Sequence, residues 1–182
     1  SISKIVKKNV SMVQRDRKER SVIRDVNVSD NLSLPTYRFK LGAGLIKPKD
    51  DKQRFVKNKQ RLSIKTNSHR DAITSLSGGN QQKVIFARWF ELDSDLYILD
   101  NPTQGVDVGA KGEIYELIAD LSDRGKSILV FSSEFPEIQK ISHRCMVMYR
   151  GEINKVLTRE ELTEMNVMYY STGANKKGEP KQ

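Results

Sequence analysis

The segment Leu76-Ser-Gly-Gly-Asn-Gln-Gln-Lys83, here called the Ser-Gly-Gly segment, has the residue types of an anion-binding loop. Its adjacent glycines, Gly78 and Gly79, let the backbone approach an anion because no Cβ stands in the way. A predicted helix at about 80–92 follows, and the N–H groups at a helix start favour a phosphate. Ser77 adds a hydroxyl donor. Because Ser-Gly-Gly also makes ordinary loops and helix caps, this segment alone does not decide between phosphate binding and a structural turn.

A second chemical feature is a buried strand that ends in a carboxylate. The apolar run 96–99 predicts a strand, and Asp100 follows it directly. Nucleotide-binding sheets present an acid to Mg²⁺ at this edge, although a strand ending in Asp is common. Ser77 and Asp100 lie 23 residues apart, which leaves room for one buried helix and a short loop. A phosphate-facing loop, a helix and an acid-tipped strand, in that order, indicate a nucleotide site.

The elements that must position these residues alternate between strands and helices. Apolar residues at helical spacing predict a helix at about 110–122, with Gly125 as its C-terminal cap. Ser29 is a predicted helix N-cap. The other predicted elements are strands at 9–13, 127–131 and 145–149, an exposed helix at about 49–62, a short helix at 136–141 and a turn at 150–151. This alternation predicts an α/β fold with a mainly parallel sheet.

Composition and charge narrow the function classes. The 182 residues suit one domain, and no apolar run approaches the roughly 20 residues that a membrane-spanning helix needs. A lone Cys145 fits a reducing compartment. Residues 1–70 hold 19 Lys/Arg and 6 Asp/Glu, against 13 and 17 in residues 71–182. The basic half suggests either a nucleic-acid contact or a solvated, partner-facing surface, and it contains no recognised nucleic-acid motif.

Taken together, these motifs resemble those of the ATP-binding-cassette ATPases. The Ser-Gly-Gly segment resembles the signature motif of that family, residues 96–100 resemble its Walker B strand, and Asp107 falls in its D-loop. The monosaccharide importer branch, with its ribose and galactose uptake ATPases, fuses two cassettes in one polypeptide. Four segments of this chain resemble that branch: residues 80–83, 105–111, 113–115 and 132–137. Two further segments, 16–18 and 28–31, resemble its second, C-terminal cassette. The resemblance covers residues 1–168 and implies a P-loop NTPase (RecA-like) core with a mainly parallel sheet plus an α-helical subdomain.

The resemblance also implies a set of roles. In the family two cassettes dimerise head to tail, and each ATP lies between the phosphate loop of one and the signature motif of the other. ATP contacts are then expected at Ser77, Gly78, Gly79, Gln81, Asp107 and Gln14, and Mg²⁺ at Asp100. The expected partners are the first cassette of the same transporter and membrane permease subunits, without direct sugar contact and without nucleic acid. The expected location is peripheral, on the cytoplasmic side of the plasma membrane.

The sequence departs from the family pattern at four points. It contains no Gly-x-x-x-x-Gly-Lys-Ser/Thr phosphate loop, which we expect to reflect an N-terminal truncation. Asn101 stands at the position of the catalytic glutamate, and an amide can orient a water but cannot accept its proton. Asn101 is alternatively only a turn residue before Pro102. Ser133 stands at the switch-histidine position, and either Gln14 or Arg15 occupies the Q-loop position.

The resulting hypothesis is the ATP-binding subunit of a sugar importer, which couples ATP binding and hydrolysis to uptake. This chain would complete one ATP site in trans and carry an impaired site of its own, with Asn101 and Ser133 as the substituted catalytic positions. Alone it is not expected to hydrolyse ATP. The alternatives are a non-transport cassette acting on ribosomes or nucleic acid, and a regulatory cassette without turnover. The expected division is a cassette at 1–168, with the Q-loop region and helical subdomain at about 15–75 and the core at 76–157, and a disordered tail at 169–182.

Overall fold

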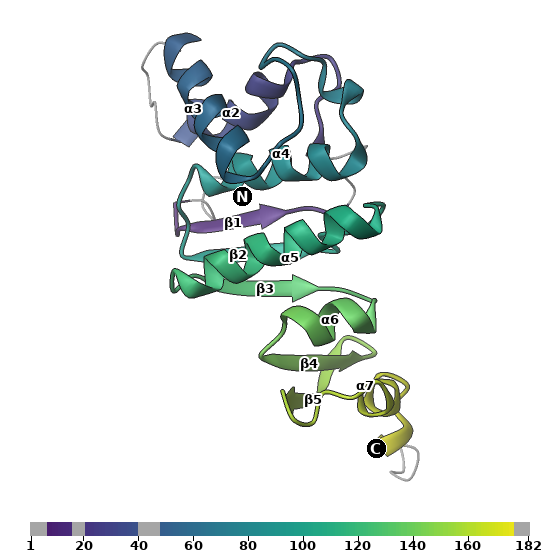
Figure 1. Ribbon diagram of the computed structural model, residues 1–182. Coiled ribbons are helices and arrows are strands. Elements are labelled where there is room, and N and C mark those ends of the chain that lie inside the picture. The colour runs from purple at the N-terminus through teal and green to yellow at the C-terminus, as the bar shows by residue number, and fades with distance from the viewer. Residues whose placement is uncertain (1–6, 16–20, 40–47, 177–182) are drawn as a thin grey trace. The chain divides into compact units, whose positions relative to one another are not determined.

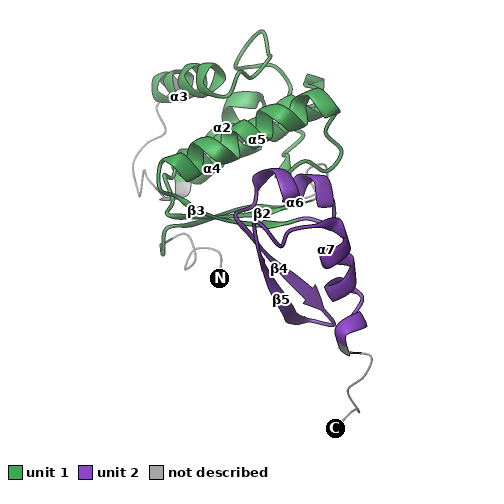
Figure 2. Cartoon of the chain, turned by 60° about the horizontal axis from the view of Figure 1, so that its bottom comes forward, with its two compact units in different colours: residues 1–131 green, residues 132–182 purple. Residues whose placement is uncertain are grey.

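The computed structural model describes residues 7–15, 21–39 and 48–176, and their contacts divide the chain into two compact units (Figures 1 and 2). The first unit spans residues 1–131 and the second residues 132–182. Within the described parts of the chain, no helix is both long and apolar enough to span a bilayer.

A three-stranded parallel sheet forms the centre of the first unit. Its strands are β1 (Val10–Val13), β2 (Leu96–Asp100) and β3 (Ser127–Phe131), in that order. Val13 pairs with Leu99, and Asp100 pairs with Phe131. All three strands therefore end at the same edge of the sheet, where Asp100 lies. The predicted parallel α/β arrangement is confirmed.

Two helices cover one face of this sheet. Helix α4 (Gly78–Phe90) contacts β1, and α5 (Val108–Asp123) contacts β3. Both helices belong to crossovers that step along the sheet in the same direction, and right-handed crossovers of this kind place their helices on the same face (Figure 2). The rings of Phe90 and Tyr97 meet edge to face, with centroids 5.6 Å apart. Gly125 ends α5 with a φ of 75°, as its predicted role as a cap requires.

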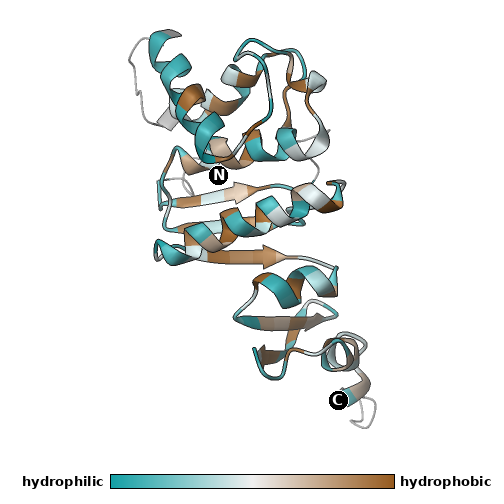
Figure 3. Ribbon diagram, viewed as in Figure 1, coloured by the Kyte–Doolittle hydropathy of each residue, from teal (hydrophilic) through white to brown (hydrophobic). Residues whose placement is uncertain are grey.

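Helices α2 (Val28–Phe39) and α3 (Pro48–Arg61) form a helical layer with α4. Helix α3 is mostly hydrophilic, as an exposed helix should be (Figure 3). Its Phe55 is buried. The predicted N-cap at Ser29 is wrong, because α2 begins at Val28 and its cap therefore lies two residues before Ser29. The cap is Asn27, whose Oδ1 accepts from the backbone N–H of Asp30 at 2.9 Å, while its Nδ2 donates back to the Asp30 carboxylate at 2.8 Å.

A buried arginine joins α4 to α2. Pro35 lies inside α2 and has no N–H, so it leaves the carbonyl of Asn31 without its usual helical donor. The Nε of Arg88 donates to that carbonyl at 2.6 Å, and the Arg88 guanidinium also donates to the Asn31 side chain and to the carbonyl of Ser21. Burial lowers the pKa of Arg88 to about 10. Arg88 therefore supplies the hydrogen-bond donor that Pro35 cannot provide.

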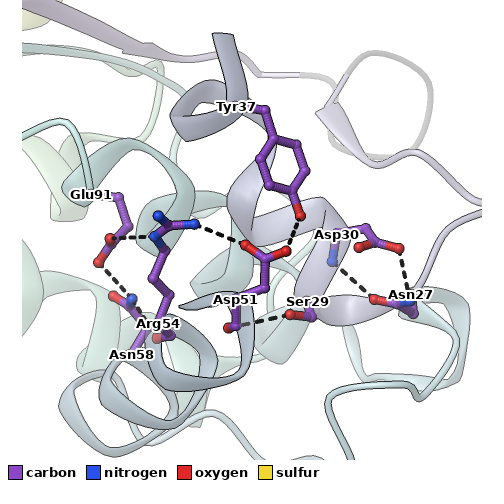
Figure 4. A network of polar contacts seen from close by, with 8 residues as sticks. All are labelled: Asn27, Ser29, Asp30, Tyr37, Asp51, Arg54, Asn58 and Glu91. Atoms are coloured by element: carbon purple, nitrogen blue, oxygen red, sulfur yellow. Dashed lines mark hydrogen bonds and ion pairs between the residues drawn. The ribbon is translucent and has the colours of Figure 1, made fainter. Parts of the chain in front are cut away.

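A polar network ties α3 to its neighbours (Figure 4). The Asp51 carboxylate accepts from the Tyr37 hydroxyl at 2.6 Å and pairs with Arg54 at 2.8 Å. Asn58 donates to Glu91, which follows α4, at 2.8 Å. Burial and the hydrogen bond to Asp51 raise the pKa of Tyr37. The network holds the helical layer together with hydrogen bonds as well as apolar contacts.

The second unit is a hairpin packed against two helices. Its elements are α6 (Phe135–Ile141), β4 (Arg144–Tyr149), β5 (Glu152–Thr158) and α7 (Glu164–Ser171). The strands pair antiparallel across the predicted Arg150-Gly151 turn, in which both residues have positive φ, 49° and 85°. Strand β5 and helix α7 are additional to the predicted elements.

The expected disordered tail is corrected in part. Residues 169–171 belong to α7, and a 3-10 turn follows at Ala174–Lys176. Asn154 holds this end of the chain by donating to the carbonyl of Tyr170 at 2.7 Å. Residues 177–182 lie outside the described part of the chain, as does the 16–18 run.

Candidate functional site

Ser77 lies at the start of α4 with its hydroxyl at the surface. Its Oγ accepts from the backbone N–H of Asn80 at 3.4 Å and from the Asn80 side chain at 2.9 Å, so Ser77 is the N-cap of α4. Since both contacts use Oγ as an acceptor, the hydroxyl proton can point outward and donate. Asn80 is itself held by the backbone N–H of Lys65, at 2.7 Å. The helix start therefore presents a donor of the kind that a phosphate oxygen accepts from.

The rest of the Ser-Gly-Gly segment is held by a hydrogen bond within the segment and by packing against α5. Gln81 donates its side-chain amide to the carbonyl of Leu76 at 2.9 Å, so in this structure it fixes the loop. Gly78 is half-buried and Gly79 is buried. Gly79 lies against the start of α5, next to Ala110 and Asp107. The structure thus brings Ser77, Gly78 and Gly79 together with Asp107.

Asp107 is the N-cap of α5. Its Oδ1 accepts from the backbone N–H of Ala110 at 2.9 Å, and the residue is exposed. Val106, directly before it, is buried and anchors the loop that leads from β2. A carboxylate at a helix N-terminus is stabilised by the helix dipole, so Asp107 has a structural reason for its place.

Asp100 and Asn101 lie at the carboxyl edge of the sheet. The side-chain amide of Asn101 donates to Asp100 Oδ1 at 3.0 Å, and its backbone N–H donates to the carbonyl of Phe131 at 2.8 Å. Asn101 has a φ of 46°, in the left-handed region that asparagine tolerates better than most residues. Its carbonyl accepts from Gln104 at 3.1 Å. Asn101 is therefore a turn residue in addition to any role in the site.

Gln14 and Arg15 leave the sheet at the same edge. They follow β1, whose last residue, Val13, pairs with Leu99, one residue before Asp100. Both side chains are exposed. The register of the Q-loop position between these two residues stays open. Ser133 belongs to the second unit, in the segment between β3 and α6, where the hydroxyl of its neighbour Ser132 accepts from Glu134 at 3.1 Å.

Asp100 is the residue whose carboxylate could hold a Mg²⁺ ion at this edge of the sheet. Among the described residues, no group of three or more His, Cys, Asp or Glu side chains could hold a metal ion. Mg²⁺ bound with a nucleotide commonly takes one or two carboxylates and completes its shell with phosphates and water. A single half-buried aspartate at the strand end fits that arrangement, and it does not fit an all-protein metal site.

Two interactions of the site were not predicted from the sequence. Lys83 is buried, with 2% of its side chain exposed; it forms an ion pair with Glu113 and donates to the carbonyl of Ser63 at 3.1 Å. A lysine within the apolar part of a predicted helix is the signal that could have indicated a buried partner. The second is the close approach of Gly79 to Ala110, for which the sequence offers only two small residues.

The fold and the motifs can now be compared with known proteins. The sequence matches the ABC transporter family over residues 1–104. It is 42% identical over 171 residues to the ribose import ATP-binding protein RbsA of Lactococcus lactis subsp. lactis (strain IL1403), covering 92% of this chain and 34% of that protein. It is 40% identical to a putative ribose/galactose/methyl galactoside import ATP-binding protein of Halalkalibacterium halodurans, covering 94% of this chain and 33% of that protein. The chain thus spans about a third of the length of these relatives.

Solved structures agree on the fold. A dimeric ATP-binding cassette in a post-hydrolysis state, bound to ADP and Pi, superposes with a TM-score of 0.73 at 21% identity, over 87% of this chain and 66% of that one. The α/β architecture with a parallel sheet is therefore that of the ABC ATPases, of the P-loop NTPase type. The family match covers more than half of the chain, and it agrees with the Ser-Gly-Gly segment and the acid-tipped strand. On this evidence, the chain belongs to the ABC transporter family.

Proposed function

We propose that this chain is part of the ATP-binding subunit of a ribose-type sugar importer and completes an ATP site in trans. Ser77, Gly78 and Gly79 would meet the γ-phosphate of an ATP held by another cassette. Two kinds of observation support the proposal. The relatives above are named as ribose or galactose import ATP-binding proteins, and Ser77 caps α4 through its acceptor atom, which leaves its proton for a phosphate.

The hydrogen bonds of the Ser77 hydroxyl add structural support to the proposed phosphate contact. A serine that capped the helix by donating its proton would have nothing to offer a phosphate. Here Oγ accepts from two N–H groups of Asn80, so capping and phosphate binding use different parts of one hydroxyl group. The side chain is exposed and lies in a loop that Gln81 and Asn80 hold in place. The donor is thus preorganised for an anion.

The chain's own ATP site would involve Asp100, Asn101 and Ser133, with Gln14 or Arg15 at the Q-loop position. We propose that Asp100 contacts Mg²⁺ and that hydrolysis at this site is slow, since Asn101 cannot act as a base. We further propose that the chain is the second cassette of its polypeptide, and that membrane permease subunits and a first cassette are its partners. It would then work at the cytoplasmic side of the membrane. The names of the relatives do not favour a ribosomal or nucleic-acid function.

Ser77 offers a clean test because it can be charged without loss of its cap. Aspartate and asparagine are both good N-caps, so Ser77→Asp and Ser77→Asn should both preserve α4. The aspartate adds a negative charge facing the γ-phosphate, which at about 4 Å costs about 4 kcal/mol near a protein surface. In the complete natural protein, purified with its bound subunits, we expect the Asp variant to hydrolyse ATP about 100-fold more slowly than the Asn variant. Equal rates would contradict the proposal.

A further inference from the structure

Gly79 is a point of close contact between α4 and α5. A Cβ added to Gly79 would lie 2.5 Å from the Cβ of Ala110, closer than two such atoms ever lie. It would also lie 3.6 Å from Asp107 Oδ2 and 3.7 Å from Val106 Cγ1. The atom that a side chain would displace is therefore the rigid Cβ of a helix residue, which can move only if α5 moves.

A second contact lies one turn along the same two helices. Lys83 follows Gly79 by four residues, and Glu113 follows Ala110 by three, so both pairs lie on the facing sides of α4 and α5. The ion pair of Lys83 with Glu113 joins the two helices there, and Lys83 also donates to the carbonyl of Ser63, after α3. The two helix starts thus lie side by side, joined by a steric contact and by a buried lysine.

Each helix start carries a different loop. Ser77, two residues before Gly79, caps α4, and Asp107, three residues before Ala110, caps α5. The loop that ends at Asp107 begins at Asn101, directly after Asp100. The contact between Gly79 and Ala110 therefore lies between the phosphate-facing serine and the loop that leaves the acid-tipped strand.

We propose that Gly79 is a positioning residue. It seats the Ser-Gly-Gly segment against the start of α5, so that Ser77 and the loop 101–107 move as one rigid block. This rests on the proposed function, in which Ser77 serves an ATP held by another cassette while Asp100 and Asn101 serve the chain's own ATP. The block then couples the two ATP sites. The approach of Ala110 alone requires glycine at position 79, in addition to any contact of the Gly79 backbone with a phosphate.

The competing explanation is that Gly79 is small only so that a phosphate can approach. The two explanations differ in what relieves an added methyl group. If the methyl of Gly79→Ala clashes with Ala110, then Ala110→Gly removes the opposing methyl and restores the close packing of the Ser-Gly-Gly segment against α5. If the methyl strikes a nucleotide, a change at Ala110 has no such effect. Gly112→Ala is a matched control in α5, since a Cβ at Gly112 would meet nothing within 4 Å.

The experiment measures steady-state ATP hydrolysis and the melting temperature of the complete natural protein, with each rate expressed per folded molecule. We expect Gly79→Ala to reduce kcat about tenfold or more. Gly112→Ala and Ala110→Gly should each remain within about threefold of the natural rate, and Gly79→Ala/Ala110→Gly should return to that range. Should Gly79→Ala fail to fold, Ala110→Val enlarges the same contact from the α5 side and should slow hydrolysis while leaving residues 76–79 unchanged.

Three results would overturn the proposal: a double variant as slow as Gly79→Ala, a full rate for Gly79→Ala, or a full rate for Ala110→Val. None of these results would contradict the proposed function, which is tested separately by the difference in ATP hydrolysis rate between Ser77→Asp and Ser77→Asn. Conversely, equal rates for the two Ser77 variants, together with rescue of Gly79→Ala, would keep the packing role and remove its link to a shared ATP.

Discussion

At the scale of single residues, the structure shows one of the two roles that the sequence left open for Asn101, the turn, while its place at the catalytic position stays a prediction. Asn101 is a turn residue, with a φ of 46° and backbone bonds to Phe131 and Gln104. Its side-chain amide also donates to Asp100 Oδ1 at 3.0 Å, at the carboxyl edge of the sheet. The sequence predicted the position of Asn101 but not its backbone conformation, because a left-handed residue depends on the turn that surrounds it. A substitution here therefore changes the turn as well as the contact with Asp100.

The role of Asn101 can be separated from its turn by a matched pair. Asn101→Glu introduces a base and Asn101→Gln a neutral side chain of the same length, and both meet the same strain at positive φ, about 1 kcal/mol. If the missing base limits this site, the Glu variant of the complete protein should hydrolyse ATP at least about tenfold faster than the Gln variant. The comparison is made by steady-state ATPase assay. Similar rates for the two variants would argue that Asn101 does not impair hydrolysis.

Arg88 leads to a prediction about stability. Lysine in its place keeps the charge but cannot reach the three acceptors that the guanidinium joins, and buried carbonyls would lose their donor. We expect Arg88→Lys to reduce the free energy of unfolding by about 2–3 kcal/mol, measured by urea denaturation. The exposed Arg124, paired with Asp120 at 2.9 Å, is the control, and Arg124→Lys should change stability by less than about 0.5 kcal/mol. Equal effects would show that the bonds to Asn31 and Ser21 carry little of the stability.

At the scale of elements, regular periodicity was predictable, whereas the N-cap of α2 was not. The apolar faces of α4 and α5 and the runs of β2 and β3 were predicted because each is a local pattern. Ser29 and Asn27 are both good caps, and only the reciprocal bonds between Asn27 and Asp30 decide where α2 begins. Strand β5 was missed because its burial is irregular and its pairing with β4 lies in the tertiary structure.

The loop between α3 and α4 should respond to acid through Asp71. A hydrogen bond from Thr66, then backbone bonds from Ser68 and Asn67, lower the pKa of Asp71 below its ordinary value near 3.8. A carboxyl group with a lowered folded-state pKa stabilises the fold above the unfolded pKa, and this contribution is lost as pH falls through the folded pKa. Asp71→Asn cannot titrate, so its urea midpoint should fall less than that of the natural chain between about pH 5 and pH 3. The exposed Asp25→Asn is the comparison. If the urea midpoint of Asp71→Asn fell with pH as much as that of the natural chain, Asp71 would not be the source of the acid sensitivity.

At the scale of the whole molecule, three sequence motifs were enough to predict the family. The contacts between the elements that carry these motifs were not predictable from the sequence. The Ser-Gly-Gly segment and the 96–100 strand were identified by residue type and spacing, and Asp107 through the resemblance to the family. That Gly79 lies against Ala110, and that Lys83 reaches Glu113 and Ser63, depends on how two helices pack in space. Spacing along a chain predicts which elements exist, and contact between elements far apart in sequence follows only from the assembled fold.

The central claim is that Ser77, Gly78 and Gly79 meet the γ-phosphate of an ATP. It is tested most directly by photolabelling the complete natural protein with an ATP analogue that carries its reactive group on the γ-phosphate, followed by trypsin digestion. Cleavage after Arg70 and Lys83 releases residues 71–83 as one peptide that contains the whole motif. We predict label in this peptide, competed by ATP, retained in Ser77→Asn and lost in Ser77→Asp. Label that is confined to other peptides, or that is unchanged in Ser77→Asp, would contradict the claim.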